Sequence, residues 1–337
     1  MKAAFAQAYA RDLRIVVALV LVTFLAAAAP AVAEPIVVDV GSSPVVVIRL
    51  HTGSLVVRTW NRSEIRIVAQ GRVRWSHADA DQVAARLHTT QNVLAQTVTT
   101  ASGELTLPPE SFVLPRLDGA HDGVRIVGNG RTVVTVPQGT ALVMARVMSG
   151  NIAFRNYHRG AFFAVVHDGA IALRDVSGTG FAQVLRGRIV ASNSSFDRLR
   201  ARTAIGMILF EHCVAQQIQA TSIRGSIAYD DGSFLAGLAR FESQSGDVAL
   251  GIGSGGAQIS ARGAAGRIYT AFRRPSSVVA RGLGARGAIG GGGPTVTASA
   301  SNGKLLIYDG ALRGHPSIAR NVPELRRALL PQARHSR

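Results

Sequence analysis

The feature that most constrains this chain is a short motif that returns about every 19 residues through its second half. Each copy opens with a glycine, and a branched apolar residue follows two positions later. The glycines are Gly150, Gly169, Gly187, Gly206, Gly225, Gly246, Gly266 and, after about two periods, Gly303. The apolar residues are Ile152, Ile171, Ile189, Ile208, Ile227, Val248, Ile268 and Leu305. A column this regular predicts one strand with one buried face in every copy.

A second column lies five residues before the glycine that ends each copy, and six of its seven members are alanine. They are Ala164, Ala182, Ala201, Ala220, Phe241, Ala261 and Ala298. Alanine in a column predicts that two walls of backbone approach closely there. We therefore expect an all-β fold, a single-stranded parallel β-solenoid (β-helix) of about 19-residue coils, in which equivalent residues stack about 4.8 Å apart. The alternative is an antiparallel sandwich with a turn at each glycine, but sandwiches rarely keep residue types in register over eight copies.

The first half predicts an N-terminal β-rich cap on this solenoid. Residues 36–75 hold several β-branched runs separated by turn residues, and another strand covers 132–136. Between them, Ser76-His77-Ala78-Asp79 resembles a capping box and predicts a short helix over 78–91, followed by a proline-rich loop over 108–123.

The chain therefore divides into four predicted parts. Residues 1–33 are a signal peptide, 34–140 an N-terminal β-rich segment with one short helix, 141–310 the solenoid repeats, and 311–337 a basic C-terminal tail. The glycine-rich stretch 282–293 is expected to leave the stack as a flexible excursion. A short amphipathic helix over 323–330 is expected to cap the open end of the stack, where exposed ladder edges invite aggregation.

The N-terminus predicts export. Three basic residues precede an apolar run over 15–29, and Ala31-Val32-Ala33 forms a small-x-small cleavage pattern before Glu34. Fifteen apolar residues are few for a membrane span, which needs about 20. We expect a periplasmic, cell-surface or secreted protein with no stable membrane span after cleavage. An uncleaved anchor is the alternative.

The ordered set of motifs resembles the bacterial "putative adhesin" domain family over most of residues 36–308. The residues that carry the resemblance are the runs 55–65 and 134–140, and the repeats Ser149-Gly150-Asn151-Ile152 and Ser245-Gly246-Asp247-Val248. The departures are Arg186, Ile205 and Arg224, which replace the serine before glycine. The resemblance implies a β-solenoid and a role in surface adhesion, and it transfers no functional residue.

The charge of the chain predicts an anionic partner. Basic residues number 37 against 20 acidic ones, and only Lys2 and Lys304 are lysines. Cleavage would lower the net charge from +17 to +15. Guanidinium groups suit carboxylate, sulfate and phosphate. The candidate face for an anionic polysaccharide or envelope polymer consists of Arg155, Arg174, Arg186, Arg188 and Arg224. The alternative is that these arginines are ordinary solvated strand positions. No specific nucleic-acid partner is predicted, and the oligomeric state is left open.

No set of residues predicts catalysis, a metal site or a cofactor. Gly282-Leu283-Gly284-Ala285-Arg286-Gly287 spells a dinucleotide fingerprint, but glycines, a proline and a strand follow it instead of a helix. His212 and Cys213 are neighbours on a strand and point to opposite faces, so they cannot act as a dyad. The nine histidines are scattered, and Cys213 is the only cysteine, so it can form no intramolecular disulfide.

Three functions remain as hypotheses. The first is an exported, non-enzymatic structural or adhesive protein of the bacterial cell envelope. The second is a polysaccharide-active β-helix enzyme, which needs two well-placed carboxylates. Its candidates are Asp175, Asp230, Asp231, Glu242 and Asp247. The third is a membrane-tethered binding or sensory domain that keeps residues 1–33.

Overall fold

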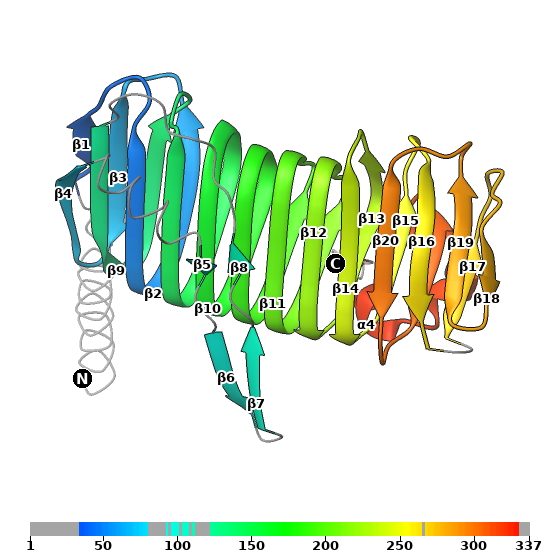
Figure 1. Cartoon of the computed structure of the whole chain (residues 1–337). Helices are drawn as coiled ribbons and strands as arrows, with labels where there is room; N and C mark the ends of the chain where they lie inside the picture. Colours follow the sequence, from blue (N-terminus) through cyan, green and yellow to red (C-terminus); the bar gives the residue numbers. More distant parts are fainter. Residues whose placement is uncertain are drawn as a thin grey trace, which may run out of the picture. The chain divides into compact units, whose positions relative to one another are not determined.

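The computed structural model describes residues 34–79, 92–93, 96–100, 103–107, 110–111, 122–264 and 267–329. The signal peptide expected over 1–33 lies outside these ranges, as do most of the helix expected over 78–91 and most of the loop expected over 108–123. Within them, the predicted all-β fold with few helices is confirmed. One 17-stranded sheet and two 2-stranded sheets account for the strands (Figure 1).

The first half of the chain supplies the strands β1 (Ile36–Asp39), β2 (Val45–Trp60), β3 (Glu64–Gln70), β4 (Val73–Asp79), β5 (Asn92–Val93), β6 (Gln96–Thr100), β7 (Gly103–Leu107), β8 (Glu110–Ser111) and β9 (Asp122–Pro137). The central strands are β10 (Leu142–Ser192), β11 (Ser195–Glu211), β12 (Val214–Arg224), β13 (Ile227–Phe234), β14 (Leu238–Ser245) and β15 (Val248–Ile252). The last strands are β16 (Ala257–Gly263), β17 (Ile268–Ala271), β18 (Val279–Arg281), β19 (Gly284–Ile289), β20 (Thr295–Ala300) and β21 (Leu305–Asp309). The helical segments are η1 (Leu312–Gly314), α3 (Pro316–Ala319) and α4 (Pro323–Leu329).

Parallel pairing joins residues that lie one motif copy apart, and we call each copy in the resulting stack a rung. Gly187 pairs with Gly206, and Ala182 pairs with Ala201. The strand segments that follow the column of glycines form one side of the core, which we call the first wall. Those that precede the column form the opposite side, the second wall. The isoleucine and alanine columns both belong to one buried hydrophobic cluster, so the two walls enclose the core.

The glycines of the motif stack on one another through their backbones. A Cβ atom placed on Gly206 would lie 1.6 Å from the carbonyl oxygen of Gly187, and the φ angle of Gly206 is +138°. The same relation links Gly130, Gly53, Gly150, Gly169, Gly187, Gly206, Gly225, Gly246 and Gly303 in stack order. No other residue type fits such a corner, because any side chain would enter the preceding rung.

A second corner follows the first wall and is built from different residues. Asn156, Asp175, Asn193, His212 and Asp231 have φ between +49° and +53° and recur at the motif period. Asn, Asp and His are the residues other than glycine that most readily adopt left-handed backbone. Each therefore turns the chain at the same place in its copy.

Chain order and stack order differ at both ends. β2 lies between β9 and β10, with parallel pairing on both sides. β21 lies between β15 and β17, so Leu305 pairs with both Val248 and Ile268. The sequence predicted that the copy at Gly266 would precede the one at Gly303, and this order is wrong. β21 occupies the rung next to β15, and Gly246 stacks against Gly303.

Two local predictions are also corrected. Ala78 and Asp79, the expected start of a helix, end strand β4, because β4 pairs antiparallel with β9 and thereby satisfies its backbone. The stretch 282–293, expected as a flexible excursion, contains β19. This strand pairs antiparallel with β16 and places Ala285 and Ile289 in the core.

The C-terminal segment packs against the side of the stack instead of capping its end. Leu312, Ile318, Val322, Leu325 and Leu329 form a cluster with outward-facing first-wall side chains. Those side chains include Leu209, Ala228, Ala249 and Leu306. The amphipathic face of α4 thus covers an apolar strip on the outside of β11, β13, β15 and β21.

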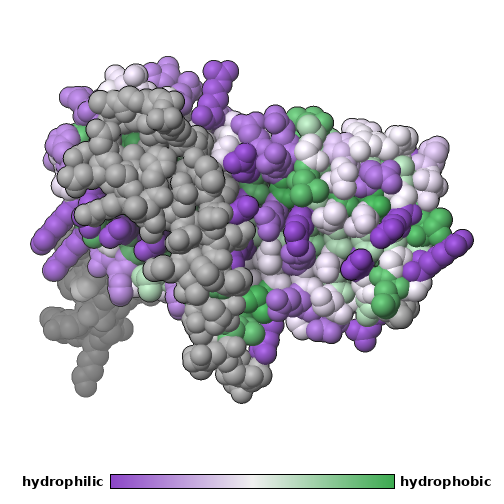
Figure 2. Space-filling view, in the orientation of Figure 1, coloured by the Kyte–Doolittle hydropathy of each residue, from purple (hydrophilic) through white to green (hydrophobic). Residues whose placement is uncertain are grey.

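On the second wall, β12, β14, β20 and β16 pair side by side in that order (Figure 1). In Figure 2, hydrophilic and hydrophobic side chains intermingle over the described part of this face. Leu107 of β7 packs here on Leu185, Ala204 and Ile223, outward residues that lie two positions before their glycines.

Candidate functional site

An arginine row crosses the outer side of the first wall. Arg58 of β2 is the register partner of Arg155 of β10. Arg155 and Arg174 each stand five residues after a glycine of the column, so Arg174 continues the row by one rung. All three side chains are exposed. Because adjacent strands lie about 4.8 Å apart, the three arginines are spaced at that interval at their backbones.

A fourth arginine extends the row at its N-terminal end. Arg66 of β3 pairs with Thr135 of β9, and Thr135 pairs with Arg58. Arg66 is exposed as well. We define Arg66, Arg58, Arg155 and Arg174 as the arginine row.

The surface beside the row is built from small side chains. These lie two positions nearer the glycine column and are all at least partly exposed: Val133, Val56, Ala153, Ala172 and Val190. Arg131 and Arg188 border the strip on its other edge, next to the glycines, and are exposed. Guanidinium groups therefore lie on both sides of the strip.

The charge in the column that holds the row changes from positive to negative along the stack. Asp175 lies beside its cationic part, with Oδ2 3.5 Å from Nε of Arg174; the two side chains are 42% and 69% exposed. Such an exposed pair contributes little to stability. Farther along the same column, Glu211 pairs with Asp230. Burial, and then the charge of Asp230, raises the pKa of Glu211.

The structure brings together some of the predicted arginines and separates the others. Arg155 and Arg174 stand side by side in the row, and Arg188 borders the same surface. Arg186 and Arg224 lie across the glycine corner from it, each directly before its glycine. They are also separated from each other by the rung of Ile205. Arg186 interacts there with Asp168 at 4.0 Å.

The sequence analysis missed the arginines that the first half contributes. Arg58 could have been found, since it stands five residues after Gly53, which joins the glycine column. A further pair lies on the second wall, where Arg49 and Arg146 are register partners. Burial, together with the charge of Arg49, lowers the pKa of Arg146. The same spacing could have found this pair, since Arg49 and Arg146 each stand four residues before a glycine of the column, Gly53 and Gly150.

The carboxylates proposed for an enzyme do not form one group. Asp231 contacts His212 at 3.3 Å, and Glu242 contacts Arg240 at 2.6 Å. Asp247 Oδ1 accepts a hydrogen bond from the Lys304 backbone N–H at 2.8 Å. Asp175 and Asp231 share the column of the second corner but stand three copies apart, and the other members occupy different columns. Asp231, Glu242 and Asp247 each hold a structural contact. Within the part of the chain that the structure describes, no group of three or more acidic, histidine or cysteine residues could hold a metal ion.

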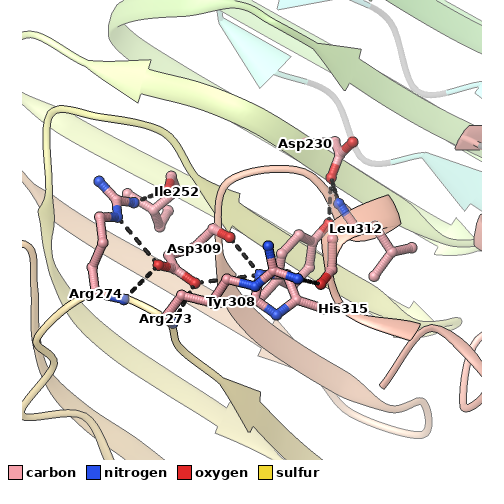
Figure 3. A network of polar contacts seen from close by, with 9 residues as sticks. Asp230, Ile252, Arg273, Arg274, Tyr308, Asp309, Leu312 and His315 are labelled. Carbon is pink, nitrogen blue, oxygen red and sulfur yellow. Dashed lines mark hydrogen bonds and ion pairs between the residues drawn. The ribbon is translucent and has the colours of Figure 1, made fainter. Parts of the chain in front are cut away.

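Asp230 secures the C-terminal segment to the stack (Figure 3). Its Oδ1 accepts hydrogen bonds from the Tyr308 hydroxyl and from the Leu312 backbone N–H, each at 2.7 Å. Burial raises the pKa of Asp230, although these two donors act in the opposite direction. The Asp230 carboxylate therefore joins β21 and η1 to the stack through these two hydrogen bonds.

Asp309 forms a second polar centre in the same region (Figure 3). Its carboxylate accepts the backbone N–H groups of Arg273 and Arg274, each at 2.9 Å, and the Arg274 Nε–H at 3.2 Å. His315 Nε2 lies 3.3 Å from Oδ1. Burial alone would raise the pKa of Asp309, but these donors and His315 outweigh it and lower the pKa.

The other motifs have structural roles. Cys213 is fully buried, and burial raises its pKa to about 12, so the thiol is not a nucleophile at neutral pH. His212, whose side chain is 51% exposed, turns the second corner. The fingerprint-like stretch that begins at Gly282 continues into strand β19, so no helix follows it.

No helix among the described residues is long and apolar enough to span a membrane. The family model described as Toastrack DUF4097 matches residues 62–303. A solved structure described as "a putative cell adhesion protein from Clostridium sporogenes" is 8% identical, over 82% of this chain and 98% of that chain, with a TM-score of 0.20. No curated protein matches the chain.

Proposed function

The chain belongs to the Toastrack DUF4097 family, and from that premise we propose that it is an exported, non-enzymatic adhesive protein of the cell envelope. In this proposal its parallel ladders close into a β-solenoid of about 19-residue coils, which serves as a rigid support. The support for the coil size is the register of the central strands, where Ala182 pairs with Ala201 and Ala201 pairs with Ala220. Export rests on the N-terminal pattern of basic, apolar and small residues.

The observation that carries the functional proposal is the arginine row. Its three consecutive guanidinium groups, on Arg58, Arg155 and Arg174, stand at the spacing of adjacent strands beside a strip of small side chains. They suit an anionic polysaccharide or envelope polymer that lies across the strands. Guanidinium groups bind carboxylate and sulfate through paired hydrogen bonds. Contacts between exposed charges are screened over roughly 8 Å at physiological salt. Binding should therefore be weak and should fall steeply as the salt concentration rises.

The test compares two variants that lose the same charge. The double variant Arg155→Gln/Arg174→Gln removes the last two of the four arginines of the row. The control, Arg281→Gln/Arg286→Gln, removes two exposed arginines on β18 and β19. We expect the first variant to bind heparin about 5- to 30-fold more weakly than the native protein, since each exposed charge contact is worth about 0.5–1 kcal/mol. The control should keep most of its affinity, and both should melt within about 2 °C of the native protein.

Three outcomes would count against this function. Equal losses in the two variants would show that net charge, and not the row, attracts the polymer. Binding that ignores salt would exclude an electrostatic contact. Heparin or polygalacturonate recovered in shortened form would favour the alternative of a polysaccharide-active enzyme.

A further inference from the structure

A cavity of about 810 Å³ lies at the turn between the second corner and the second wall, near the N-terminal end of the stack. Its polar lining residues come from separate rungs: Ser43, Gln138, Thr140, His158, Arg159 and Ser177. None of its lining residues, all of which the structure describes, is acidic. The volume falls within the range of small-molecule sites, roughly 300–1,000 Å³.

Hydrogen bonds between neighbouring rungs orient the donors of this cavity. The Arg159 backbone N–H donates to Ser177 Oγ at 3.4 Å. Ser177 Oγ also lies 3.2 Å from His158 Nδ1. Because Oγ already accepts the Arg159 N–H, its own hydrogen can donate to Nδ1. A neutral His158 then carries its proton on Nε2, which leaves one N–H donor for a ligand.

The backbone of Arg159 is unusual within this fold. Among the described residues, six other than glycine have positive φ, and five of these are the Asn, Asp and His residues of the second corner. Arg159, at φ +64°, is the sixth and the only one of another type. A glycine would adopt this conformation at no steric cost. Its guanidinium group forms no ion pair with the part of the chain that the structure describes. Backbone strain of this kind concentrates at functional sites.

We infer that this cavity binds one carboxylate-bearing sugar. The planar guanidinium group of Arg159 matches a carboxylate with two parallel hydrogen bonds, which an ammonium group cannot form. His158 supplies a further donor, and the hydroxyl and amide groups of Ser43, Gln138 and Ser177 can bind sugar hydroxyls. The site lies beyond the second corner from Arg155 and does not depend on the arginine row. It recognises one residue of a glycan, whereas the row follows the charge of a polymer.

The test uses galacturonic acid, galactose and inorganic phosphate in calorimetric titrations of residues 34–337. We expect galacturonic acid to bind at least tenfold more tightly than either galactose or phosphate. Arg159→Gly should weaken galacturonic acid binding at least tenfold, since a charge-assisted pair is lost. The same change should leave the melting temperature equal or higher, because glycine accepts the backbone conformation. Arg159→Lys should recover only part of the affinity.

The control Arg281→Gln, on β18, should bind galacturonic acid as the native protein does. Native affinity in Arg159→Gly would overturn the inference, as would phosphate binding as tightly as galacturonic acid. Heparin binding measured on the same variants keeps the two proposals separate. If the proposal for the row is correct and the inference for the cavity is wrong, Arg155→Gln/Arg174→Gln weakens heparin binding. Arg159→Gly then changes the affinity for neither heparin nor galacturonic acid.

Discussion

Replacing Gly206 with alanine should destabilise the stack far more than an ordinary glycine-to-alanine change. The added Cβ would lie 1.6 Å from the carbonyl oxygen of Gly187, whereas real Cβ atoms stay at least 3.0 Å from such an atom. That oxygen belongs to a backbone ladder and cannot swing away as a flexible side chain can. The rungs at residues 187 and 206 must therefore separate locally, at the middle of the stack.

Three terms set the size of this loss. The backbone conformation, with φ at +138°, lies in a region that residues with a Cβ rarely adopt, and it costs such a residue about 1–3 kcal/mol. Overpacking adds about 1–3 kcal/mol, and each ladder hydrogen bond that lengthens adds about 1 kcal/mol. With one such hydrogen bond, we expect Gly206→Ala to lower the free energy of unfolding by about 3–7 kcal/mol.

Gly282 supplies the matched control. Its φ is +56°, and no atom lies within 4 Å of an added Cβ. Gly282→Ala therefore carries only the conformational term, about 1 kcal/mol. Urea unfolding of the two variants and of the native chain, followed by circular dichroism, measures the difference. Equal losses would refute the stacked-glycine reasoning, since they would mean that conformation alone sets the cost.

Three other predictions concern the Asp309 carboxylate, the Cys213 thiol and the N-terminus. Asp309 has a lowered pKa, so its contribution to stability is present above the ordinary aspartate value of about 3.9 and is lost as pH falls through the lower folded value. Unfolding midpoints between pH 6 and pH 3 should thus fall less in Asp309→Asn than in the native protein, and parallel curves would contradict this. The Cys213 thiol, buried and with its pKa raised to about 12, should react with a disulfide reagent only in urea. Rapid labelling of the folded protein would show that its rung opens. Intact-mass measurement of the exported protein should give a chain that begins at or near Glu34, and a retained Met1 would support the anchor.

The central rungs could be predicted from sequence because each one repeats the same local rules. The alternation after Gly187 and Gly206 fixes which side chains face the core, and the period fixes their partners. The alanine column pairs in the predicted register even where Phe241 replaces alanine and pairs with Ala220. Local pattern and tertiary structure agree here because every partner lies one period away.

The ends could not be predicted in this way, because their partners lie far apart in the chain. Nothing local to Leu305 shows that its strand lies between the strand of Val248 and the strand of Ile268 and pairs with both. Alternation likewise places Ser226 on the outer side of the first wall, yet it is only 3% exposed. Its hydroxyl oxygen accepts the Asp247 backbone N–H at 3.1 Å.

The candidate site was predictable only in part. Arg155 and Arg174 share a place in consecutive copies, so the repeat was enough to pair them. Arg58 and Arg66 join them through strands of the first half, one of which runs antiparallel to β9. The cavity beside Arg159 could have been located from the repeat, because His158 and Ser177 each stand eight residues after a glycine of the column, as Gln138 does after Gly130.

The interleaved ends also decide how a chain of this kind can change its length. At each end, a strand is held between two neighbours from distant parts of the sequence, β2 between β9 and β10, and β21 between β15 and β17. A repeat unit appended to either terminus could not take the place of β2 or β21 in the stack, because each of these strands already pairs on both sides. From β10 to β15, however, the chain advances rung by rung, so an inserted unit of about 19 residues moves both ends apart as intact blocks. Longer and shorter relatives should therefore gain and lose their copies from the interior.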